Sequence, residues 1–168
     1  RKLHHMMAGS IDPAASYLLL RGMKTLELRV RQQNRTAEQL ASFLVGHPKI
    51  SRVWYPTVPD HPDHEVAMRQ NSKGWGGLLS FEIRGSEWSK PTFDAAGRFV
   101  DSLRIPYIAT SFGGTESLVE QVCIMSYFKQ TLQTRMDLGI TNGLIRFACG
   151  VENTDDIIAD VDQALEYV

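Results

Sequence analysis

A long run of helical spacing in the first third of the chain limits most strongly what it can fold into. An aspartate–proline pair at residues 12–13 is typical of a helix start, because the carboxylate caps free amides and proline suits the first turn. Apolar residues then recur at helical intervals, with Gly22 as a weak point and polar Gln33 as the one gap. A Gly-His-Pro sequence at residues 46–48 ends the pattern. We therefore predict one helix over residues 13–45, about 50 Å long and long enough to bridge two domains or two subunits.

The remainder of the chain alternates short strand patterns with helical ones. Leu79, Phe81 and Ile83 alternate with polar residues, which is typical of a half-buried strand. The patterns predict an α+β fold, in which a small, mainly antiparallel sheet carries helices on one face and follows the long bridging helix. We expect strands at residues 50–55, 79–83, 107–109, 119–125 (ambiguous) and 144–149, and helices at residues 65–70, 89–103, 130–138 and 153–168.

Composition and charge exclude some classes of partner. The 168 residues are 43% hydrophobic and 22% charged with a formal net charge of -1, an ordinary globular balance that does not favour nucleic acid. The apolar runs are too short for a membrane span, and no signal peptide is visible. We therefore expect no nucleic-acid or membrane partner.

The two cysteines and the first residues indicate where the chain belongs. Cys123 and Cys149 lie in apolar surroundings, which favours two buried thiols in a reduced intracellular, cytoplasmic compartment, although the sequence leaves a disulfide open. The chain does not begin with methionine. We expect it to begin inside a larger protein, or to have lost a first residue by processing.

Arg146 stands in the middle of an apolar strand pattern at residues 143–150. A buried arginine must be paired, because burying an unpaired charge costs several kcal/mol. Its planar fork suits a carboxylate, which it can hold by two parallel hydrogen bonds. The residues alone leave two interpretations open: a salt bridge to Glu116 or Glu152, or recognition of a ligand carboxylate.

A hydroxyl lies beside a flexible Gly-Gly backbone at residues 111–114. Ser111 could be an ordinary turn serine that bonds to nearby backbone, and such serines are common in loops. Thr110 precedes it with a small uncharged side chain. We expect Glu116 to be a structural partner of backbone amides or of a cation rather than a catalytic base.

Two other groups of side chains invite chemical roles that we reject. His61 and His64 lie among acidic residues, but their spacing alone is a weak metal signal without a second ligand cluster, so we predict no metal site. His4 and His5 carry little weight. Lys24 is one of several cations on an amphipathic helix, whereas a Schiff-base lysine needs a pocket that depresses its pKa.

Several of these segments together resemble the carboxy-terminal domain of the pyridoxal-phosphate (PLP) enzymes of cysteine and methionine metabolism. This trans-sulfuration family includes the cystathionine γ-synthases, the cystathionine lyases and methionine γ-lyase. The resemblance extends from residue 3 to residue 165, and within the family it is strongest to plant-type cystathionine γ-synthases. Val122 stands where the family usually has proline, and Asn153 where aspartate is usual. The matching segments lie at residues 21–26, 55–65, 105–117, 124–128 and 144–150.

The resemblance implies roles for individual residues. Arg146 would hold the α-carboxylate of an amino-acid substrate, and Ser111 would lie in the active site near the cofactor lysine and the substrate. Thr110 would lie at a position that varies with substrate preference. Val122 could change a loop in or near the active site, whereas Asn153 still suits a helix cap.

The resemblance also implies how this chain relates to a complete enzyme. We find no segment similar to the family's cofactor-lysine motif, so no residue here is predicted to bind PLP and the chain alone is predicted to be inactive. Residues 1–10 would be the tail end of a large PLP-binding domain, and residues 11–168 the carboxy-terminal substrate domain.

The expected activity of the complete enzyme is γ-replacement on an activated homoserine ester by cysteine. The alternatives are γ-elimination, as in cystathionine or methionine γ-lyases, and a non-catalytic stand-alone interaction domain. We expect a homo-oligomer, and a plastid location is possible for a plant protein.

Overall fold

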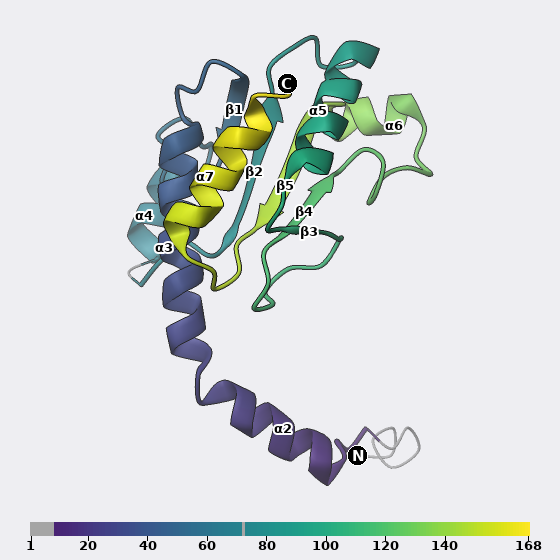
Figure 1. Ribbon diagram of the computed structural model, residues 1–168. Helices are drawn as coiled ribbons and strands as arrows, with labels where there is room; N and C mark the ends of the chain where they lie inside the picture. Colours follow the sequence, from purple (N-terminus) through teal and green to yellow (C-terminus); the bar gives the residue numbers. More distant parts are fainter. Residues whose placement is uncertain (1–8, 72) are drawn as a thin grey trace.

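The computed structural model describes residues 9–71 and 73–168 and places a mixed five-stranded sheet at the centre of the fold (Figure 1). The strand order is β1-β2-β5-β4-β3, and all neighbours are antiparallel except β3 and β4. This confirms the predicted α+β fold with a mainly antiparallel sheet. The strands are β1 (Ile50–Trp54), β2 (Leu78–Ile83), β3 (Tyr107–Ile108), β4 (Leu118–Gln121) and β5 (Leu144–Ala148).

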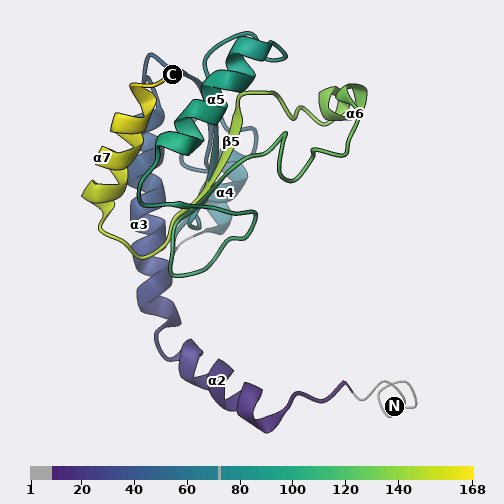
Figure 2. The same cartoon turned by 45° about the vertical axis from the view of Figure 1, so that its right-hand side comes forward.

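Three long helices cover one face of this sheet (Figure 2). Two of them begin at the predicted caps: Ser89 Oγ accepts a hydrogen bond from the amide of Thr92, and Asn153 Oδ1 accepts one from Asp155 at 2.8 Å. The three helices are α3 (Leu26–Leu44), α5 (Lys90–Ser102) and α7 (Thr154–Leu165), while α4 (His64–Gln70) and α6 (Leu132–Asp137) are short.

The sheet therefore has a covered face and an open face. On the covered face, the Phe81 ring meets the Phe99 ring of α5 edge-on, with ring centroids 5.6 Å apart. On the open face the strand register sets a row of side chains opposite one another across four strands, from β1 to β4. This row is Trp54, Ser80, Arg146 and Glu120, and the buried apolar residues of the covered face include Val53, Leu79, Phe81, Val119, Ile145 and Phe147.

The predicted single helix over residues 13–45 is wrong in one respect, because the structure breaks it in two (Figure 1). α2 (Pro13–Met23) ends in a tight turn, where the amides of Lys24 and Thr25 donate to carbonyls three residues earlier. The side chain of Arg29 donates to the Gly22 carbonyl at 2.9 Å. α2 buries no residue, so no packing keeps it in line with α3, and the weak point at Gly22 lies next to the break.

The ambiguous strand pattern at residues 119–125 resolves into a shorter strand. β4 ends at Gln121, and the chain then turns. Val122, which stands where the resemblance leads us to expect proline, donates its amide hydrogen to Leu144 O at 3.1 Å. Proline has no such donor, so this substitution extends the bonding between β4 and β5 by one residue.

Cys123 and Cys149 are free and buried, as favoured from the sequence. Burial raises the pKa of both thiols. Within the described residues, no helix is both long and apolar enough to cross a bilayer.

Candidate functional site

Arg146 occupies the centre of β5, with β2 on one side and β4 on the other. Its strand neighbours Ile145 and Phe147 point into the core and are fully buried, so the alternation of the strand turns Arg146 to the open face. The Arg146 side chain is 20% exposed there. The central strand thus holds one cation in a fixed place on the face of the sheet that the three long helices leave open.

The carboxylate that pairs with Arg146 is Glu120, directly opposite on β4. Glu120 Oε1 lies 3.0 Å from Arg146 Nη1, in ionic contact without an aligned hydrogen bond, and its side chain is 1% exposed. Ser126 Oγ donates to the other oxygen, Oε2, at 2.8 Å. The predicted partners Glu116 and Glu152 were therefore wrong, because the register between β4 and β5 decides the pairing and the sequence left β4 ambiguous.

Arg146 also meets the loop at residues 110–117, called the site loop below. Its Nη2 group donates to the backbone carbonyls of Thr110 and Ser111, the latter at 3.1 Å. The guanidinium carbon lies 5.6 Å from the centroid of the Phe112 ring. The structure thus brings Thr110, Ser111 and Arg146 together, while the side chains of Thr110 and Ser111 stay exposed.

The far end of the site loop is held by Glu152. Its two carboxylate oxygens accept from the amide and the hydroxyl of Ser117, at 2.6 and 2.8 Å. The Ser117 hydroxyl in turn accepts from the amide of Gly150 at 2.9 Å. The role of amide partner predicted for Glu116 therefore falls to Glu152, which the sequence offered only as a partner for Arg146.

The contact between Gly150 and the site loop requires glycine, because there is no room for a side chain at this position. A Cβ on Gly150 would lie 2.3 Å from Thr115 O. The next amide, that of Val151, donates to the same carbonyl at 2.8 Å. The glycine that ends the Arg146 segment therefore allows two distant stretches of backbone to touch.

Four of the described lysines lie in other contacts or in a turn. Lys49 donates to backbone carbonyls at the end of α7, Lys90 pairs with Asp94 at 2.8 Å, and Lys129 lies 5.6 Å from an aromatic ring. Lys24 lies in the turn between α2 and α3. None of these four amines meets the site loop.

The histidines rejected as metal ligands make local backbone contacts. His61 Nδ1 accepts from the amide of Asp63 at 3.1 Å, and His64 Nδ1 lies 2.8 Å from Pro56 O. In the ranges 9–71 and 73–168, no three His, Cys, Asp or Glu side chains gather as metal ligands would. Residues 4–5 lie outside the described residues.

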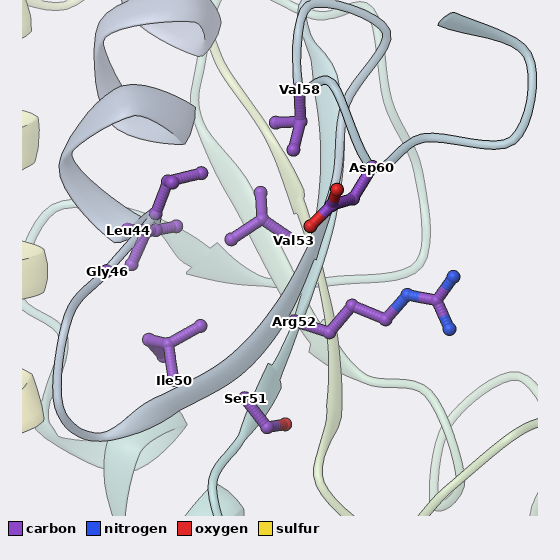
Figure 3. A pocket seen from close by; sticks show the side chains of 9 residues that line it. Leu44, Gly46, Ile50, Ser51, Arg52, Val53, Val58 and Asp60 are labelled. Carbon is purple, nitrogen blue, oxygen red and sulfur yellow. The ribbon is translucent and has the colours of Figure 1, made fainter.

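A separate hollow of about 450 Å³ lies at the outer edge of β1 (Figure 3). It shares no lining residue with the site loop and does not include Arg146. Its floor is apolar and its rim carries one cation and one carboxylate. The labelled residues of Figure 3 are Leu44, Gly46, Ile50, Ser51, Arg52, Val53, Val58 and Asp60.

The fold is that of the carboxy-terminal domain of a fold-type I PLP-dependent enzyme. It matches cystathionine γ-lyase from Lactobacillus plantarum complexed with L-serine, with a TM-score of 0.85, 32% sequence identity, and coverage of 99% of this chain and 42% of that chain. The family model for Cys/Met metabolism PLP-dependent enzymes matches residues 1–166. The chain belongs to this family, which confirms the resemblance found from the sequence.

The similar curated proteins include synthases and lyases. The chain is 51% identical over 168 residues to cystathionine γ-synthase 1, chloroplastic, of Arabidopsis thaliana, covering 100% of this chain and 29% of that protein. It is 38% identical over 166 residues to L-methionine γ-lyase of Fusobacterium nucleatum subsp. polymorphum, covering 99% of this chain and 40% of that protein. The chain therefore spans less than half the length of these relatives.

Proposed function

We propose that this chain forms the substrate-binding, carboxy-terminal part of a complete PLP enzyme that acts as a cystathionine γ-synthase. Such an enzyme replaces the γ-substituent of an activated homoserine ester with the sulfur of cysteine. The observation that carries the proposal is the Arg146 guanidinium, fixed on the open face against the site loop. The similarity to plant cystathionine γ-synthases, at 48–51% identity, supports this activity over others in the family.

In this proposal Arg146 binds the α-carboxylate of the amino-acid substrate. A guanidinium has five N–H donors, and two of its contacts go to the neutral carbonyl oxygens of Thr110 and Ser111, which a carboxylate would replace with a stronger contact between two charged groups. Glu120 keeps the guanidinium in place from the other side. The Ser111 hydroxyl, exposed beside it, would position the substrate or the cofactor lysine.

We propose that a segment outside these 168 residues holds PLP. When bound, the cofactor supplies the electron sink for the reaction, and the residues of this chain bind and orient the substrate. Residues 11–168 would be the substrate domain and residues 1–10 the end of the larger domain. Residues 1–8 of that boundary lie outside the described residues.

A labelling experiment tests this division. The isolated chain is mixed with PLP, reduced with borohydride and mapped for modified lysines, and amino-acid turnover is measured in parallel. We expect weak labelling spread over several exposed lysines and no turnover. Stoichiometric labelling of one lysine together with turnover would show that this chain carries its own active site.

The arginine role is tested by Arg146→Lys in the complete enzyme, meaning a polypeptide that ends with this chain. An ammonium is a point charge and cannot make the two-pronged contact. Loss of a charge-assisted hydrogen bond costs about 1.5–3 kcal/mol, or roughly tenfold to a hundredfold in substrate affinity. Unchanged kinetics in a correctly folded variant would leave Arg146 a structural partner of Glu120.

The serine role is tested by Ser111→Ala in the same enzyme. The exposed hydroxyl should matter more to turnover than to folding, so the melting temperature should hardly change while turnover falls. If instead stability collapses and the folded fraction keeps full turnover, Ser111 is a turn residue and its assignment to the site is wrong.

A γ-lyase activity is the second candidate, because the chain is also 38% identical to a methionine γ-lyase. The two reactions give different products. A synthase forms cystathionine from the ester and cysteine, whereas a lyase releases ammonia and a keto acid. Measuring both sets of products with one preparation of the complete enzyme separates the candidates. A preparation that forms neither set would favour a non-catalytic interaction domain.

We also propose that the complete enzyme is a homo-oligomer and, in a plant, a plastid protein. The Arabidopsis and tobacco relatives are named chloroplastic. Light scattering of the complete enzyme tests its oligomeric state, and fractionation of the source cells tests its location.

A further inference from the structure

A buried amide side chain on α3, that of Gln33, contacts the site loop. Gln33 is 7% exposed and is the polar gap in the apolar spacing of the helix. Burying an amide without a hydrogen bond costs about 1–3 kcal/mol on mutational data. A glutamine is therefore an expensive choice at an inward-facing helical position unless its amide is needed there.

The Gln33 amide reaches across the fold to one backbone carbonyl. Its Nε2 group donates to Gly114 O at 2.7 Å, a contact between residues 81 positions apart. The start of β2 makes room for this side chain: a Cβ on Gly77 would lie 2.9 Å from Gln33 Cβ and 3.3 Å from Cys149 O. The approach of Gln33 to the loop thus depends on a glycine in a third segment.

The contact with Gly114 matters because Gly114 lies in the middle of the site loop, away from its fixed ends. Both ends of the loop are fixed by other groups: just before its start the amide of Ala109 donates to Val119 O, and at its end Glu152 accepts two hydrogen bonds from Ser117. Between these ends, Gly113 adopts a φ of 79°, which favours glycine, and Gly114 has no side chain. The middle of the loop is the part with the greatest backbone freedom.

Two side chains hold this middle part in place. Arg146 binds the carbonyls of Thr110 and Ser111 from the open face, and Gln33 binds the carbonyl of Gly114 from α3. A substrate carboxylate that takes the place of the loop carbonyls on Arg146 would release the first of these holds. The Gln33 contact would then be the remaining side-chain hold on the middle of the loop.

We propose that Gln33 is a positioning residue for the substrate site: it keeps the segment from Thr110 to Gly114 against Arg146 while the substrate carboxylate exchanges with the loop carbonyls. The inference rests on the proposed function, and it adds the bridging helix to the parts that determine substrate affinity. Gln33 itself acts through the loop backbone rather than through contact with the substrate.

The test is Gln33→Met in the complete enzyme, because methionine keeps the length and burial of the side chain and removes the donor. Loss of one neutral hydrogen bond of about 0.5–1.5 kcal/mol corresponds to an increase of roughly twofold to twelvefold in KM for the amino-acid substrate. We expect kcat to change less than KM. Hydrogen exchange of the loop amides at positions 112–115 should become faster.

The matched control is Gln163→Met. Gln163 is a half-buried glutamine on α7 that donates to Ser102 O at 2.8 Å, a similar helix-to-carbonyl bond that does not involve the site loop. A general loss of stability should lower the melting temperature of both variants, whereas only Gln33→Met should raise KM and speed exchange in the loop.

Arg146→Lys, measured alongside, separates this inference from the proposed function. If Arg146→Lys raises KM and Gln33→Met leaves it unchanged, the positioning role is overturned while the site stands. If Arg146→Lys has no effect on KM, the proposed function fails, and amide hydrogen exchange in the Gln33→Met variant then tests the role of Gln33. Faster exchange confined to the site loop would support Gln33 as the residue that anchors the loop. Unchanged exchange would overturn that role.

Discussion

The two faces of the sheet are built from the same strands, yet they carry opposite kinds of side chain. On the covered face, residues such as Phe81, Ile145 and Phe147 are fully buried against the helices. On the open face the neighbouring positions hold Glu82 and Arg146, and burial raises the pKa of the Glu82 carboxyl. The covered face stabilises the fold, whereas the open face carries polar and charged groups, which are costly to bury, and one of them, Arg146, meets the site loop.

The difference between the two faces shows which substitutions should affect stability and which should affect binding. Packing on the covered face decides whether the sheet forms, because close-packed side chains leave little room for a change of volume. Charge on the open face decides what the surface can bind. Four substitutions test this division, in order of decreasing expected effect on stability.

Phe147→Ala on the covered face should have the largest effect. Phe147 is 0% exposed and follows the central residue of β5. Truncation of a buried phenylalanine costs about 3–5 kcal/mol of unfolding free energy. Denaturant unfolding of the native chain and of the variant measures this loss, and a loss below about 1 kcal/mol would contradict the assignment of stability to the covered face.

Glu120→Gln on the open face should cost less. The variant keeps the shape of the side chain but leaves the Arg146 charge without its carboxylate, and we expect a loss of about 1–3 kcal/mol because Arg146 is still partly hydrated. A double-mutant cycle with Arg146→Met isolates the pair. A coupling energy near zero would show that the two residues are neighbours without being partners.

Glu82→Gln should show a smaller effect that depends on pH. Burial raises the folded-state pKa of Glu82 above its unfolded value, although a hydrogen bond from Thr141 at 3.1 Å partly opposes the shift. The folded state then binds the proton more tightly, so native stability is greatest below the unfolded pKa and falls as the pH rises through the folded pKa. The variant should gain stability over the native chain near neutral pH and lose this advantage in acid. A pH series of melting curves would refute the prediction by showing the opposite trend.

Ser80→Ala should have the smallest effect. Ser80 lies opposite Arg146 on β2, half-buried on the open face. Surface substitutions away from special features usually change stability by less than about 0.5 kcal/mol. A larger loss in chemical denaturation would indicate that Ser80 helps to hold the guanidinium and that the open face contributes more to folding than we infer.

The covered face could be predicted from the sequence because its signals are local. Alternation at Leu79, Phe81 and Ile83 gave β2, and the caps at Ser89 and Asn153 gave the starts of two helices. Each of these signals lies within a few residues of the element that it predicts. The predicted sheet and its covering helices are accordingly confirmed.

The sequence-based predictions were wrong where a contact between distant residues, or the absence of such a contact, determines the structure. Glu120 pairs with Arg146 through the register of β4 and β5, and Gln33 meets Gly114 from a helix 81 residues earlier, so neither partner is visible in local spacing. The break after Met23 has the reverse cause. The spacing of α2 is helical, but no buried contact maintains its line with α3. The roles of Ser111, Thr110 and Arg146 in substrate binding stay predictions.

The two outer strands have a consequence for the behaviour of the protein at high concentration. An unpaired strand edge can template association between molecules, and proteins limit this hazard with short edge strands, bulges and charges. β3 has two residues, and the pairing of β1 shifts register between Ile50 and Arg52, whose guanidinium carbon lies 4.7 Å from the Trp54 ring centroid. Both edges are therefore poor templates for intermolecular β-pairing, so the sheet resists growth into fibrous aggregates.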